Sequence, residues 1–168
     1  NPVADGVNIA YLRAATAPSP RGLVLADMGG ELELVAPTTQ TPLYLLRDGW
    51  IAYVRPGVGG QRQLWLRNPM GMAQQMTFYG TDLFIAPLAI GPAGEVIFRR
   101  DDRTWLSRFG SAELPSELGS SLGNFERWLW LAPRPWVALG RSLFEVELPL
   151  FADGFESGDT SGWTTTIP

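Results

Sequence analysis

A repeat of about 40 residues runs through most of this chain and restricts the folds open to it. Four short apolar runs each contain a β-branched residue in register, 42, 45 and 41 positions apart: Ile9, Ile51, Val96 and Val137. Each run is followed by a second one that opens with arginine, at Arg21, Arg62, Arg103 and Arg141. A period of roughly 20 to 50 residues is typical of propellers and solenoids, in which each unit buries its apolar faces against its neighbours.

Both runs of each repeat have the composition of strands, because they are rich in β-branched and aromatic residues and too short for stable helices. Turn-forming residues separate them at 18–20, 57–60 and 101–102. Further strands are expected at 32–36, 42–46, 72–78, 83–89 and 127–131. Four antiparallel strands per period predict an all-β, four-repeat β-propeller-like fold, with four blades, no helix and an extended C-terminal tail.

The two terminal repeats are incomplete in the sequence. Residues 1–7 replace a full leading strand in the first repeat, and the fourth shows no obvious closing strand after Leu148. An unpaired strand edge exposes N–H and C=O groups that attract another strand. We therefore expect these edges to be covered within the chain or by a neighbouring chain.

The second repeat carries a family resemblance. Residues 50–55 read Trp-Ile-Ala-Tyr-Val-Arg, and after a glycine turn residues 63–68 read Gln-Leu-Trp-Leu-Arg-Asn, with Gln74-Gln75-Met76-Thr77 closing the unit. This pattern resembles the TolB-type β-propeller repeat, and weaker copies extend the resemblance over about residues 7–148. The resemblance implies a propeller built of stacked four-stranded blades.

The C-terminal segment breaks the repeat and suggests a division into a repeat domain, 1–148, and a tail, 149–168. Residues 153–163 read DGFESGDTSGW, which resembles the ending of many secreted proteins of Gram-negative bacteria. The resemblance implies export, and a chain that opens at Asn1 without methionine fits a processed terminus. Phe151, Phe155 and Trp163 are separated by even numbers of residues, so an extended tail would place them on one side as an interface. We expect an extracellular or cell-surface protein whose tail is a sorting signal or a strand-donating segment.

Composition excludes several classes of function. The chain has no cysteine, histidine or lysine, which removes nucleophilic triads, thiolate chemistry, ordinary zinc sites and Schiff bases. Its net charge is −4 and its 13 arginines are dispersed, so nucleic acid is not an expected partner. The sequence contains no run of 18 apolar residues, so no membrane span is predicted. We expect no cofactor and no enzymatic activity.

Carboxylates are the remaining candidates for chemistry. Asp153, Glu156 and Asp159 lie among glycines and are weak candidates for calcium ligands, although their spacing does not fit an EF-hand. The pairs Asp101-Asp102 and Glu145/Glu147 are the candidate acid and nucleophile of a two-carboxylate glycoside hydrolase. Asp101-Asp102 stands where a hairpin turn is expected, which favours a structural role.

Three tryptophans lie close together in the fourth repeat. Trp128 and Trp130 share one face of the expected strand, while Trp136 follows after a proline-containing turn. Two interpretations stay open for them, core packing between blades and an exposed interface. The repeated arginines are expected to cap strand edges or pair with turn carboxylates rather than bind an anionic ligand.

Low charge, incomplete terminal blades and an additional tail favour a protein that acts by contact. The leading hypothesis is an exported, non-enzymatic structural protein, a self-assembling subunit of an extracellular or cell-surface filament and therefore a homo-oligomer. The alternative is a secreted propeller binding module for a carbohydrate or protein ligand, which predicts a concave aromatic site. A two-carboxylate glycoside hydrolase is the third hypothesis.

Overall fold

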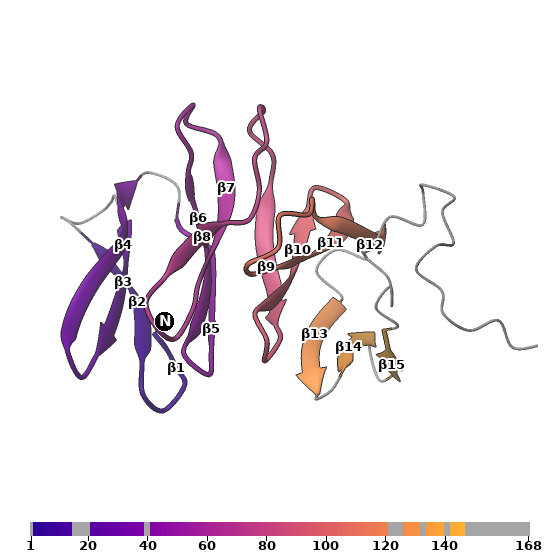
Figure 1. The fold of residues 1–168 in the computed structure, drawn as a ribbon, viewed down its shortest axis with the longest axis horizontal. Helices are drawn as coiled ribbons and strands as arrows, with labels where there is room; N and C mark the ends of the chain where they lie inside the picture. Colours follow the sequence, from indigo (N-terminus) through magenta and orange to yellow (C-terminus); the bar gives the residue numbers. More distant parts are fainter. Residues whose placement is uncertain are drawn as a thin grey trace, which may run out of the picture.

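The computed structural model describes residues 2–14, 21–38, 41–120, 126–131, 134–139 and 142–146. Within these ranges every regular element is a β-strand and no helix occurs, which confirms the all-β prediction. The strands form four antiparallel sheets that follow one another in chain order, one for each sequence repeat. The sheets form a row in which the first three follow one another along the long axis of the molecule, while the fourth lies beside the third, below it in Figure 1.

The four sheets are named here by their order in the chain. The first contains β1 Val3–Ala4, β2 Ile9–Ala14, β3 Arg21–Asp27 and β4 Gly30–Thr38. The second contains β5 Tyr44–Arg47, β6 Trp50–Pro56, β7 Arg62–Arg67 and β8 Ala73–Gln75. The third contains β9 Ile85–Ile90, β10 Glu95–Arg100, β11 Arg103–Arg108 and β12 Ser116–Ser120. The fourth contains β13 Glu126–Leu131, β14 Arg134–Leu139 and β15 Ser142–Glu145.

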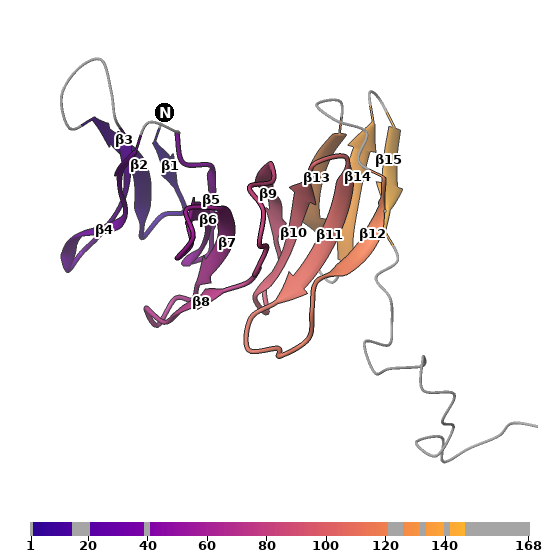
Figure 2. The ribbon, with the colours of Figure 1, turned by 90° about the horizontal axis from the view of Figure 1, so that it is seen from above.

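Each sheet is a simple antiparallel meander, as in a propeller blade, but the row of blades does not close. The first sheet lies at one end of the molecule, and the third and fourth sheets lie together at the other, as Figures 1 and 2 show from two directions. The first sheet has a leading strand of only two residues, in line with the incomplete first repeat. The fourth has three strands among the residues that the structure describes, and the expected closing strand after Leu148 lies outside them.

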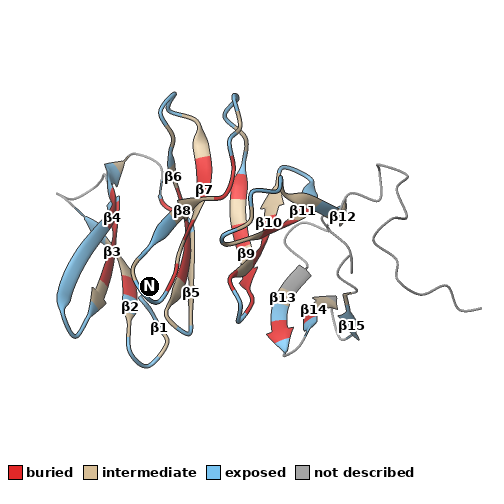
Figure 3. Ribbon diagram, in the orientation of Figure 1, coloured by how far each residue is buried: buried red, intermediate tan, exposed pale blue. Residues whose placement is uncertain are grey.

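Three apolar cores lie between neighbouring sheets. Because side chains alternate along a strand, β6 contributes to two of them. Ile51 and Tyr53 pack against Leu23 and Leu25 of the first sheet. Ala52 and Val54 face the third sheet. Figure 3 shows the buried segments, in red, on strands that face a neighbouring sheet. A blade therefore buries both faces only when it has a neighbour on each side.

Tight turns and close packing fix these sheets in place. Asp101 and Asp102 form the two-residue turn between β10 and β11, where Asp101 has a φ of 51°, so their predicted structural use is confirmed. Gly94 has a φ of +84°, and a Cβ there would lie 2.5 Å from the Trp50 ring. Trp50 packs edge to face on Phe109 across the second and third sheets, with ring centroids 5.3 Å apart. Glycine at position 94 is thus required by both backbone conformation and space.

Two of the repeated arginines pair with carboxylates, one with Asp82 in a connecting segment, as expected, and the other with Glu117 within β12. Arg62 contacts Asp82 through its Nε and Asp82 Oδ1 at 3.0 Å, and Arg103 forms an ion pair with Glu117. Arg141 lies outside the described residues. The part of the chain that the structure describes contains no helix that is long and apolar enough to cross a membrane.

Candidate functional site

The strand register divides the three tryptophans of the fourth sheet between its two faces. Trp128 pairs with Val137, and Leu129 pairs with Trp136. Directly paired residues of an antiparallel ladder place their side chains on the same face. Trp128 and Trp130 therefore share the inner face of the fourth sheet, and Trp136 lies on the outer face with Leu129.

The inner face is part of the core. Trp130 is 5% exposed and packs with Ala89, Ile97 and Leu106 of the third sheet, and Trp128 packs at the margin of the same cluster. A Cβ at Gly91 would lie 2.8 Å from the Trp130 ring, so the two sheets approach closely here. These two side chains attach the fourth sheet to the row.

The outer face is apolar and open. Leu129, Leu131 and Leu143 are 45%, 48% and 48% exposed, and Trp136 is half-buried beside them. One ion pair crosses this face, between Arg134 Nη1 and Glu145 Oε1 at 2.8 Å. Among the described residues β15 pairs with β14 alone, so its second edge has no strand partner there. The fourth sheet thus combines an apolar face with a strand edge.

The other end of the row is different. The outer face of the first sheet carries a polar cap of Tyr11, Arg13, Glu31 and Glu33. The Tyr11 hydroxyl and the Arg13 guanidinium both donate to Glu31, and these two hydrogen bonds lower the pKa of the Glu31 carboxyl. Val24, on the same face, is only 1% exposed. This face therefore presents mainly polar and charged groups to solvent, alongside Ile9, which is 47% exposed.

Two of the carboxylates considered from the sequence, Asp101 and Glu145, have structural partners. Asp101 Oδ1 accepts a hydrogen bond from the Phe84 N–H at 3.1 Å, and Glu145 binds Arg134. The described residues contain no group of three or more side chains arranged to hold a metal ion. The remaining predicted positions lie outside the described residues: Glu147, Phe151, Asp153, Phe155, Glu156, Asp159 and Trp163.

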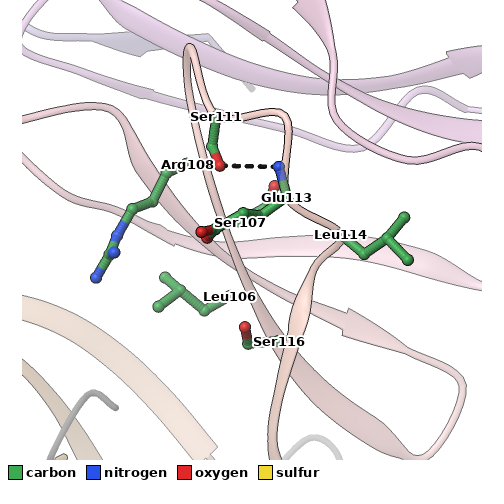
Figure 4. Close-up of a pocket in the computed structure, with 7 residues that line it drawn as sticks. All are labelled: Leu106, Ser107, Arg108, Ser111, Glu113, Leu114 and Ser116. Carbon is green, nitrogen blue, oxygen red and sulfur yellow. Dashed lines mark hydrogen bonds between the residues drawn. The ribbon is translucent and has the colours of Figure 1, made fainter. Parts of the chain in front are cut away.

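A groove that sequence reasoning missed lies between the second and third sheets. It has a volume of about 610 Å³ and is formed by the segment after β8 and by the loop that joins β11 to β12. Phe78, Tyr79, Glu113 and Leu114 are among the residues that line it. The same loop borders a cavity of about 20 Å³, shown in Figure 4, where Ser111 Oγ accepts a hydrogen bond from the Glu113 N–H at 3.0 Å. That cavity has room for about one water molecule.

No protein family, curated protein or solved structure was found to match this chain. The likeness to TolB-type repeats is supported at a coarser level, by four antiparallel sheets in a blade-like row.

Proposed function

We propose that this protein is an exported, non-enzymatic structural protein that assembles with copies of itself into an extracellular or cell-surface filament. The observation that carries the proposal is the apolar outer face of the fourth sheet, where Leu129, Leu131 and Leu143 are each about half exposed. Terminal units of repeat proteins need a polar outer face to remain in solution. The outer face of the first sheet is of this kind. In the fourth sheet, a partner subunit covers the apolar outer face instead.

A filament is favoured over a closed pair because the two ends of the molecule differ. A contact between unlike surfaces of successive copies repeats without closing and extends into a fibre. The second edge of β15 adds backbone N–H and C=O groups that a strand from the next copy can pair with. Export is supported by the resemblance of residues 153–163 to the ending of secreted proteins.

The proposal is tested by replacing Leu129 and Leu131 together with threonine, which keeps β propensity and removes the apolar side chains. Leu32→Thr in the first sheet is a matched control, since Leu32 is also 45% exposed. Sedimentation velocity and negative-stain microscopy should show filaments for the wild type and for Leu32→Thr. The double variant should remain mainly monomeric.

Two results would contradict the proposal. One is a wild-type protein that stays monomeric at all concentrations accessible to sedimentation. The other is a double variant that forms filaments as readily as the wild type. Far-UV circular dichroism of each variant verifies that the sheets are still folded.

A further inference from the structure

The groove between the second and third sheets has the size and the fixed geometry of a ligand site. Its volume of about 610 Å³ falls in the range of roughly 300 to 1,000 Å³ that is usual for small-molecule pockets. All the residues that line it belong to the continuous described range 41–120. None of its lining residues belongs to the fourth sheet.

One wall presents an aromatic ring to solvent. Phe78 is 75% exposed, whereas phenylalanine is usually among the most buried residue types. The segment that carries it is held by two buried polar side chains, Gln63 at 3% and Thr77 at 1% exposure. A ring held open to solvent on a fixed segment is available to stack on a ligand.

These two side chains form a connected hydrogen-bond network. Gln63 Nε2 donates to the Tyr79 carbonyl at 2.8 Å, and Gln63 Oε1 accepts from the Tyr79 N–H at 3.1 Å. Thr77 Oγ1 donates to Gln63 Oε1 and accepts from the Leu64 N–H, both at 2.9 Å. Satisfied buried networks of this kind rigidify the backbone around them. Phe78 lies between the two residues, Thr77 and Tyr79, that the network holds.

The opposite wall is tied to the first by Gln74. Its Oε1 accepts a hydrogen bond from the Gly110 N–H at 2.7 Å, and its Nε2 donates to the Ser111 carbonyl at 3.3 Å. The loop after β11 is therefore joined to the second sheet by one side chain. The groove is formed before any ligand arrives, which reduces the entropy lost on binding.

The groups that line the groove fit a neutral sugar. Gln75 Nε2 donates a hydrogen bond to the Thr77 carbonyl at 2.7 Å. Gln75 Oε1 accepts no hydrogen bond among the described residues. The Ser111 hydroxyl still has a proton to donate, and Glu113 has no ion-pair partner among the described residues. Amide, hydroxyl and carboxylate groups match sugar hydroxyls, and an open aromatic ring matches the C–H face of a pyranose.

We propose that this groove binds a neutral oligosaccharide, with one sugar ring stacked on Phe78. Glu113 carries the only charge among the described residues that line the groove, which disfavours sulfated or carboxylated ligands. The lining combines polar side chains such as Gln75, Ser111 and Glu113 with apolar ones such as Phe78 and Leu114, a mixture that fits the alternating C–H faces and hydroxyls of a sugar.

The test uses the full chain on an array of cello-, malto- and chito-oligosaccharides, with sulfated oligosaccharides and apolar peptides on the same array. The series that binds best is then titrated calorimetrically against variants. Phe78→Ala should weaken binding about tenfold, since a lost aromatic stacking contact is worth roughly one decade in affinity. Phe78→Tyr should retain binding, and Glu113→Gln should weaken it several-fold because a charged acceptor is lost.

Phe144→Ala is the matched control, because Phe144 is 50% exposed but lies in the fourth sheet. It should bind as the wild type does. The proposal is overturned if no neutral series binds, if only sulfated sugars or apolar peptides bind, or if Phe78→Ala binds as tightly as the wild type. Each variant is compared with the wild type by circular dichroism before titration. None of these results depends on whether the protein forms filaments.

Discussion

The two terminal sheets of the row have similar inner faces and opposite outer faces. Each inner face joins a core, through Leu23 and Leu25 in the first sheet and through Trp130 in the fourth. On the outer faces the first sheet carries the polar cap, while the fourth exposes leucines such as Leu129 and Leu131 to about half. The same repeat pattern thus yields one outer face that is mainly polar and one that exposes leucines to solvent.

The largest expected effect tests how firmly the fourth sheet is attached. Trp130→Ala should lower the free energy of unfolding by about 3 to 5 kcal/mol, since it opens a cavity between the third and fourth sheets. Trp136→Ala, on the outer face of the same sheet, should cost only about 1 kcal/mol because that side chain is half-buried. Urea unfolding in the Leu129→Thr/Leu131→Thr background measures both without a contribution from assembly. Equal losses for the two would show that the faces do not differ.

A second prediction sharpens the contrast by removing the tail. Deleting residues 149–168 should abolish filament formation while the circular dichroism of the sheets is unchanged. The physical reason is that a segment following β15 directly can add a strand to the exposed edge of a neighbouring copy. Negative-stain microscopy gives the readout. If the truncated protein assembles as readily as the full chain, the tail is a sorting signal and contributes nothing to the contact.

The smallest expected effect concerns the other end of the row. Asp5 accepts hydrogen bonds from the Asn8 N–H at 2.9 Å and from the Gly49 N–H at 2.6 Å, which links the first sheet to the second. Desolvation works to raise the pKa of Asp5, but the backbone donors Gly49, Asn8 and Val7 lower it, with a net shift below the ordinary value of 3.8. The stability that this carboxylate contributes is therefore present above about pH 4 and is lost as the pH falls through the lowered pKa.

Asp5→Asn should accordingly cost about 1 kcal/mol at neutral pH, a value reduced by solvent screening at a partly exposed group. The loss should disappear at low pH, where the wild-type carboxyl is protonated as well. Asp27→Asn is the control, because Asp27 Oδ1 accepts only within its own turn, from the Gly29 N–H at 2.7 Å. Urea unfolding between pH 2 and 7 measures both variants, and a constant loss across that range would show that the charge of Asp5 is irrelevant.

Much of the fold was predictable because it depends on local patterns. The alternation at residues 51–54 divides that strand between two cores, and the turn at Asp101-Asp102 follows from residue type and position. These features need only strand periodicity and turn chemistry.

The surfaces were less predictable because they depend on register between strands. Trp128 and Trp136 are close in sequence, but they lie on opposite faces because Trp128 pairs with Val137. In the polar cap Tyr11 contacts Glu31, and Phe78 and Ser111 line the same groove. These residues are far apart in the sequence, and the repeat pattern does not predict that they meet. The exposure of Phe78 was not predicted, because the sequence placed it in a strand over 72–78, whereas β8 covers only Ala73–Gln75.

Hydrogen exchange measured by mass spectrometry tests most directly whether the outer face of the fourth sheet is the contact surface. Assembled wild-type protein is compared with the monomeric Leu129→Thr/Leu131→Thr variant, strand by strand. The largest slowing of amide exchange on assembly should fall in β13 to β15, with a smaller change or none in β2 to β4, where the polar cap lies. Equal exchange of β13 to β15 in filaments and monomers would contradict this assignment and place the contact elsewhere on the molecule.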